Sequence, residues 1–222
     1  MPVPSRLPDA VVIVYLHGFA SSPQSSKRAF LAAKFSEHGV TLHSPDFNLP
    51  DFSTLTITRM IGQVTAAIDE AGEEPFVLIG SSLGGFVAVQ TALARPGRVA
   101  RMVLLAPALD FSGNRLRDLG DRGLEEWETS GQLNVFHYGY GRMIPLHYGL
   151  YTDASGYECV NARLEMPILI FQGRRDTAVS PDTVESWARA RPNVELHLLD
   201  DDHQLTSSLD YIWQETRRFL EI

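Results

Sequence analysis

Short runs of aliphatic residues recur along the chain, and longer segments with helical periodicity separate them. The runs occupy residues 11–16, 76–79, 102–105, 168–171 and 194–199. Four of the five runs are continuously apolar, which is typical of strands that are covered on both faces in a parallel sheet. The pattern therefore predicts a buried, mostly parallel sheet.

The segments between these runs have the periodicity of helices. Residues 55–71 repeat apolar side chains at the spacing of one buried helix face. Residues 26–38 are expected to bury three apolar side chains and to leave the charged ones in solvent, namely Lys27, Arg28, Lys34 and Glu37. Further helices are expected over 84–94, 180–190 and 209–220, and Ser180-Pro181 has the composition of a helix start.

The alternation of strands and helices predicts a doubly wound α/β fold with right-handed crossovers. No internal repeat, low-complexity tract or linker divides the sequence, so we expect one domain over residues 1–222. Residues 110–165 break the alternation and are rich in tyrosine and other aromatic residues. An insertion of this length is usually functional. We interpret it as a lid over an apolar pocket, and the alternative is a packing flap that does not contact substrate.

Charge and cysteine content limit which partners and which cellular compartment we expect for the protein. The formal net charge of −8 and the pI near 5.3 argue against nucleic acid, because there is no basic excess to neutralise phosphates. Cys159 is the single cysteine, cannot form an internal disulfide and is expected to be a small core residue. The first apolar run is too short to span a bilayer, and no secretory signal is visible. We therefore expect a cytoplasmic protein with no membrane span; the oligomeric state is left open.

The motif G-x-S-x-G identifies a candidate nucleophile. Residues 80–84 read Gly-Ser-Ser-Leu-Gly, and only Ser82 is flanked by glycine two positions away on both sides. A serine on a sharp strand-to-helix turn requires small neighbours at these positions. An apolar strand precedes the motif and a helix follows it, so Ser82 is the predicted nucleophile. Ser81 is expected to orient neighbouring groups by hydrogen bonding.

A serine hydroxyl needs a general base, and His203 is the predicted base, because it lies on a polar loop between the last strand and the last helix. Asp176 follows the strand at 168–171 and is the predicted acid; Asp110, after the preceding strand, is the alternative. His197 alternates with apolar neighbours within a strand, so we expect a structural role. Three aspartates precede His203, but consecutive residues rarely converge on one ion, and no metal or cofactor is expected.

Acyl transfer also needs two donors for the developing oxyanion. The N–H group of Leu83, directly after the nucleophile, is one predicted donor. The other is expected from the loop after the first strand, with Phe19 as the predicted donor and Ala20 as the alternative. His17 is expected to brace this loop rather than to act as a base. The stretch "SSPQSSK" at 21–27 reads as an anion-binding turn or, more simply, as a loop and helix cap.

Four stretches follow one another along the chain: "LHGF", "GSSLGG" with Ser82, "GRRDTAV" with Asp176 and "DDHQL" with His203. With the triad order Ser82, Asp176, His203, the chain resembles the α/β-hydrolase superfamily. Residues 15–27 are similar to small bacterial esterases of the YqiA type. Residues 79–111 resemble the branch of mitochondrial palmitoyl-protein thioesterases and acyl-glucuronide esterases. The resemblance implies cofactor-free hydrolysis of small-molecule carboxylic esters or thioesters.

Two alternatives stay open. The same triad can serve a peptidase or a C–C bond hydrolase, and a hydrolase-like module can bind a ligand without catalysis. Three arginines of the insertion either select an acidic substrate or face solvent, namely Arg115, Arg117 and Arg142.

Overall fold

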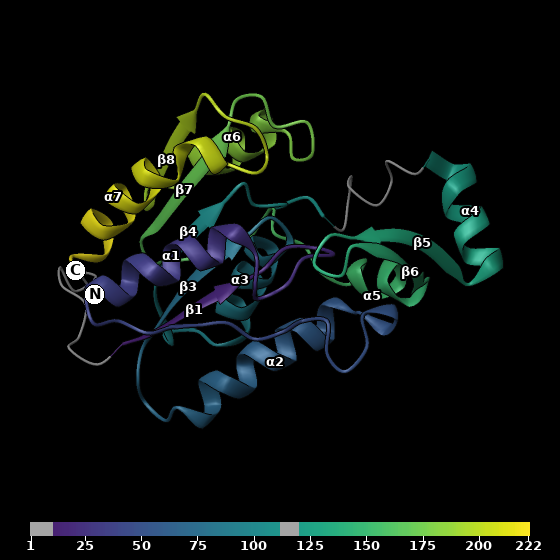
Figure 1. The fold of residues 1–222 in the computed structure, drawn as a ribbon, viewed down its shortest axis with the longest axis horizontal. Coiled ribbons are helices and arrows are strands. Elements are labelled where there is room, and N and C mark those ends of the chain that lie inside the picture. The colour runs from purple at the N-terminus through teal and green to yellow at the C-terminus, as the bar shows by residue number, and fades with distance from the viewer. Residues whose placement is uncertain (1–10, 112–119) are drawn as a thin grey trace.

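The computed structural model describes residues 11–111 and 120–222, and a six-stranded sheet lies at its centre (Figure 1). The strand order is β2-β1-β3-β4-β7-β8, and every neighbouring pair is parallel. The strands are β1 (Val12–Leu16), β2 (Leu42–His43), β3 (Phe76–Ser81), β4 (Val99–Leu105), β7 (Ile168–Gly173) and β8 (Val194–Leu199). The predicted parallel sheet and α/β class are thereby confirmed.

Helices cover both faces of the sheet. One face packs against α2 (Ile57–Glu70), α3 (Leu83–Ala94) and α6 (Pro181–Arg189), and the other against α1 (Ser26–Glu37) and α7 (Leu209–Leu220). Successive strand residues point to opposite faces, so Val14 and Leu16 join the first layer whereas Ile13 and Tyr15 join the second. The continuous apolar runs follow from this double burial.

The start of α2 differs from the sequence prediction. Helix α2 begins at Ile57 rather than at residue 55, because the Thr56 side chain accepts the Arg59 N–H group as an N-cap. A short 3₁₀ turn, η1 (Phe52–Thr54), precedes it. Another 3₁₀ turn, η3 (Thr206–Ser208), precedes α7.

The prediction that Lys27 faces solvent is wrong. Lys27 is only 7% exposed and shares the buried face of α1 with Leu31 and Phe35. These residues are spaced by four positions, so they lie above one another on the helix. Residue type alone predicts exposure for every charged residue of α1, but position 27 lies on the buried face of the helix.

The insertion contains structure of its own. Helix α4 (Gly120–Ser130), the antiparallel pair β5 (Gln132–His137) and β6 (Arg142–His147), and helix α5 (Gly149–Ala154) project to one side of the main sheet (Figure 1). Trp127 is buried here, and its indole N–H donates to the Leu146 carbonyl at 3.0 Å.

None of the helices over 11–111 and 120–222 is long and apolar enough to cross a membrane.

Candidate active site

The carboxyl ends of four parallel strands bring the predicted site residues to one edge of the sheet. Ser82 follows β3, Asp176 follows β7, and His203 lies on the loop after β8. Phe19 lies on the loop after β1. In doubly wound sheets this edge is where ligands bind, at the point where the strand order reverses. Here the strand order reverses between β1 and β3: the strand that follows β1 in the chain, β2, lies on one side of this pair, and the strand that follows β3, β4, lies on the other side.

Ser82 occupies a strained turn between β3 and α3. Its φ of 53° and ψ of −118° lie where residues with a side chain rarely occur. The turn leaves no room for side chains at Gly80 and Gly84. A Cβ on Gly80 would lie 2.5 Å from the Gly84 carbonyl oxygen, and a Cβ on Gly84 would clash with the Leu16 carbonyl oxygen. These contacts are the physical reason for the glycines of the motif.

His203 lies between Ser82 and Asp176 and is hydrogen-bonded to both. Its Nε2 is 3.1 Å from the Ser82 hydroxyl, and its Nδ1 is 2.8 Å from Asp176 Oδ2. Asp176, rather than the alternative Asp110, is thus the carboxylate in contact with Nδ1. With a proton on Nδ1, Nε2 is the ring nitrogen able to accept the serine proton.

The Asp176 carboxylate is buried and fully bonded. Oδ1 accepts the N–H groups of Ala178 and Val179, each at 2.8 Å, and Oδ2 also accepts the Gln172 amide at 2.9 Å. Burial alone would raise the pKa of Asp176, but the hydrogen bonds from His203, Val179 and Gln172 outweigh it and hold this pKa below its ordinary value. The carboxylate stays ionised beside the imidazole.

The loop that carries His203 is fixed by its own aspartates. Asp201 is buried and accepts the Ser208 hydroxyl at 2.8 Å. Asp202 accepts the Gln204 N–H at 2.8 Å, and Asp200 forms an ion pair with Arg175. Each of the three carboxylates thus has a separate partner.

The loop after β1 packs directly against Ser82. A Cβ on Gly18 would lie 3.2 Å from Ser82 Cβ, so the backbone leading to Phe19 approaches the serine closely. His17 is 1% exposed; its Nε2 accepts the Phe47 N–H at 3.0 Å, and its Nδ1 lies 3.0 Å from the Gly18 carbonyl oxygen. Burial lowers the pKa of His17. A neutral imidazole therefore braces this loop. Leu83 opens α3, where N–H groups have no partner within the helix.

A cavity of about 770 Å³ opens at Ser82 and His203. Its apolar lining includes Phe19, Leu83, Ala108, Phe111 and Ala178, and its polar lining includes Ser21, Ser22, Gln24, Ser25, Ser26, Lys27 and Gln204. Ser81 also lines it. A pocket lined by both apolar and polar residues suits an amphipathic substrate.

The insertion contributes Phe111, Tyr138 and Gly139 to this cavity. Its other aromatic rings pack among themselves; Trp127, for example, meets Tyr148 at 5.6 Å. His137 is buried and bonded to Asn48 Oδ1 at 3.0 Å, which ties the hairpin to the loop before η1. Arg142 is exposed on β6, and Arg115 and Arg117 lie outside the described residues.

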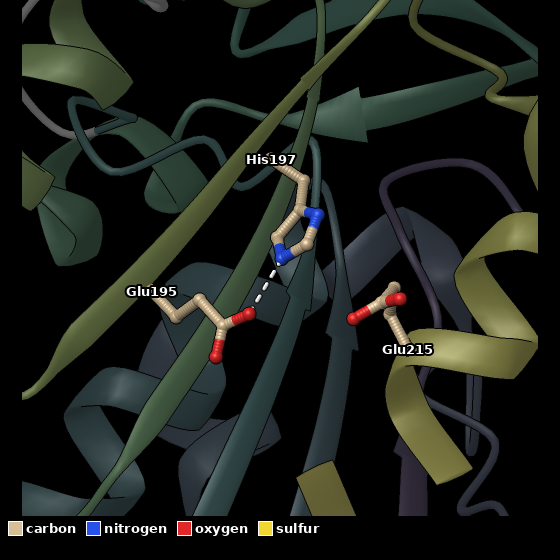
Figure 2. Close-up of side chains that lie close together, drawn as sticks. All are labelled: Glu195, His197 and Glu215. Atoms are coloured by element: carbon tan, nitrogen blue, oxygen red, sulfur yellow. Dashed lines mark hydrogen bonds and ion pairs between the residues drawn. The ribbon is translucent and has the colours of Figure 1, made fainter. Parts of the chain in front are cut away.

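A second cluster of ionisable groups lies on β8 and α7, away from Ser82. Figure 2 shows Glu195 and His197 on β8 and Glu215 on α7, with ligand atoms within 4.8 Å of one another. His197 Nε2 lies 2.7 Å from Glu195, and its Nδ1 lies 2.7 Å from the Tyr211 hydroxyl. Arg218 forms ion pairs with both glutamates. Since a guanidinium already neutralises both carboxylates, this arrangement fits a bridge between strand and helix better than a metal site.

Comparisons with known proteins agree with the fold. A model of the Uncharacterised protein family (UPF0227) matches residues 12–220. Lipase LipV of Mycobacterium tuberculosis is 31% identical over 126 residues, covering 50% of this chain and 48% of the lipase. The mitochondrial palmitoyl-protein thioesterase ABHD10 of Rattus norvegicus is 24% identical over 222 residues, covering 89% of this chain and 70% of the thioesterase. The chain thus spans about half the length of the lipase that it matches.

Among solved structures, α/β hydrolase domain-containing protein 10 from mouse superimposes with a TM-score of 0.81 at 19% identity. The superposition covers 97% of this chain and 91% of the mouse protein. The fold is therefore the α/β-hydrolase fold.

Proposed function

We propose that the chain, which belongs to the Uncharacterised protein family (UPF0227), is a serine hydrolase that cleaves carboxylic esters or thioesters. The hydrogen-bonded series from Asp176 through His203 to Ser82, at a strained strand-to-helix turn, is the observation that carries the proposal. The relatives named a lipase and a palmitoyl-protein thioesterase support the same chemistry. The substrate is a small molecule that enters the cavity at Ser82.

In this mechanism Ser82 Oγ attacks the carbonyl carbon while His203 Nε2 takes the hydroxyl proton. The N–H groups of Phe19 and Leu83 donate to the oxyanion of the tetrahedral intermediate. His203 then returns the proton to the leaving alcohol or thiol, and the acyl group stays on Ser82. Water, activated by His203, attacks the acyl-enzyme and releases the acid. Asp176 holds the ring orientation and stabilises the imidazolium.

A cytoplasmic location belongs to the same proposal. It is supported by the cysteine content: Cys159 is the single cysteine and cannot form an internal disulfide, so nothing in the chain points to an oxidising compartment.

The test is hydrolysis of p-nitrophenyl esters from acetate to decanoate. We expect turnover by the wild type and a loss of at least about 10⁴-fold in kcat for Ser82→Ala. Ser81→Ala is the matched control because the two serines are adjacent, and it should retain measurable turnover. A fluorophosphonate probe should label the wild type and not Ser82→Ala. Full activity in Ser82→Ala, or no turnover of any ester, would refute the assignment.

A further inference from the structure

Lys27 is a buried cation with few partners at the wall of the substrate cavity. Its side chain is 7% exposed, and Lys27 lines the cavity together with Ser82 and His203. Its Nζ donates to the His203 carbonyl oxygen at 3.5 Å, a long hydrogen bond. An ammonium group has three N–H donors, and buried charges are normally paired.

The nearby carboxylates are occupied elsewhere. Asp176 accepts four hydrogen bonds, and Asp201 is bonded to Ser208. Asp202 accepts the Gln204 N–H. Within the described part of the chain, no carboxylate forms an ion pair with Lys27. These aspartates favour the charged ammonium from a distance, and burial lowers its pKa to about 8. Lys27 is therefore cationic at neutral pH.

The surroundings of Lys27 suit an anion. Lys27 lies in the first turn of α1, where N–H groups are free of helix partners, and the N-cap Ser25 makes no capping hydrogen bond. Ser25, Ser26 and Lys27 all line the cavity, as does Ser22 from the preceding turn. The described lining includes no aspartate or glutamate. The polar residues of the lining thus offer hydroxyl groups, a helix N-terminus and a lysine ammonium group.

The position of Lys27 decides which part of a substrate it would meet. In the proposed reaction His203 protonates the leaving group, so the leaving group must lie beside His203. Lys27 contacts the main chain of this same residue. The apolar residues of the lining, including Phe19, Leu83 and Phe111, can contact the acyl chain.

We propose that the cavity prefers esters or thioesters whose leaving group carries a carboxylate or phosphate, and that Lys27 pairs with this anion. The inference rests on the proposed hydrolase function and assigns the substrate class of the same site. A charge-assisted hydrogen bond inside a cavity changes binding by about 10- to 100-fold.

The experiment compares three butyrate esters of matched size: 3-(butanoyloxy)benzoate, 3-(butanoyloxy)phenyl phosphate and the neutral 3-(butanoyloxy)benzamide. We expect the wild type to favour at least one anionic ester over the amide by about 10-fold or more in kcat/KM. In Lys27→Met this ratio should fall toward one. Lys34→Met is the matched control: both lysines of the chain lie on α1, but Lys34 is paired with Glu37 at the surface and should keep the wild-type ratio.

The outcomes separate the two proposals. Hydrolysis of none of the three esters would remove the hydrolase function and this inference together. Hydrolysis of all three without preference would leave the hydrolase and overturn the role of Lys27, as would an unchanged ratio in Lys27→Met. If Lys27→Met does not fold, wild-type inhibition decides: 3-hydroxybenzoate must inhibit p-nitrophenyl butyrate hydrolysis competitively and more strongly than 3-hydroxybenzamide, and the reverse order overturns the proposal.

Discussion

Asp176 holds the imidazole of His203 through Oδ2 and is itself held by two main-chain N–H groups at Oδ1. In Asp176→Asn the amide cannot accept a hydrogen bond at every one of these contacts. The imidazole ring is then no longer held in the tautomer with a proton on Nδ1, and the imidazolium loses its counter-charge. We expect kcat to fall by about 10³- to 10⁴-fold with a smaller change in KM, measured with the best p-nitrophenyl ester. Asp110→Asn is the comparison, and a larger loss there would move the acid role to Asp110.

His17 gives the fold a dependence on pH. Burial lowers the pKa of His17, so the folded protein resists a proton that the unfolded chain accepts near pH 6.5. The stabilisation is fully present above that pH and is lost as the pH falls through the lowered folded value. As the pH falls below about 6.5, the free energy of unfolding should decline by up to about 1.4 kcal/mol per pH unit from this group until His17 is protonated in the folded protein.

Urea unfolding at several pH values measures this decline. His17→Gln keeps polar atoms near Phe47 and removes the titration, so its stability should depend less steeply on pH than that of the wild type. Identical slopes in the two proteins would show that His17 does not couple folding to pH.

The position of a residue in the candidate site can be predicted from sequence where it depends on the local backbone geometry or on the order of residues and strands along the chain. Glycine spacing predicts Ser82 at the sharp turn, and the positions of Asp176 and His203 after strands predict that they lie beside it; the structure brings the three side chains together. The charge of Lys27 predicts exposure to solvent, whereas the residue is buried. Its burial follows from the register of α1 against the loop after β8, which depends on packing between distant segments.

At the scale of elements, the contact between α3 and β1 depends on a missing side chain. A Cβ on Gly84 would clash with the Leu16 carbonyl oxygen, whereas a Cβ on Gly62, within α2, would meet nothing within 4 Å. Gly84→Ala should therefore destabilise the fold by several kcal/mol or prevent folding. Gly62→Ala should raise stability by up to about 1 kcal/mol through helix propensity.

Thermal unfolding of the two variants measures both effects. The pair is matched because the same methyl group is added to a helix in each case. Equal effects of the two substitutions on Tm would contradict the account of a backbone contact at Gly84.

The main strands were predictable because burial on both faces produces continuous apolar runs. The hairpin was not predictable in this way, since β5 alternates exposed and half-buried residues over most of its length and half of the residues of β6 are exposed. β2 has two residues, too few for any periodic signal. Its place beside β1 is decided by the sheet rather than by its own sequence.

At the scale of the whole molecule, net charge and local charge act in opposite directions. The chain carries a formal charge of −8 and should repel an anionic ester at long range, whereas the buried Lys27 attracts it at short range. Salt screens the exposed charges more than the buried one. Raising NaCl from 20 to 200 mM should increase kcat/KM for 3-(butanoyloxy)benzoate by about 2-fold.

The neutral 3-(butanoyloxy)benzamide is the reference substrate and should show little dependence on salt. A fall in kcat/KM for the benzoate, without a fall for the benzamide, would mean that exposed cations attract the anion.

The hairpin of β5 and β6 forms a sheet of its own and shares no strand pairing with the six-stranded sheet within the described residues. The serine turn and the loop after β1, in contrast, are joined by backbone contacts at Gly18 and Gly84. Sequence drift in the hairpin can therefore remodel the rim of the cavity while the reactive centre keeps its shape. For the engineer, the exposed positions of the hairpin are the ones open to exchange, and the glycines are the points at which the scaffold must not be altered.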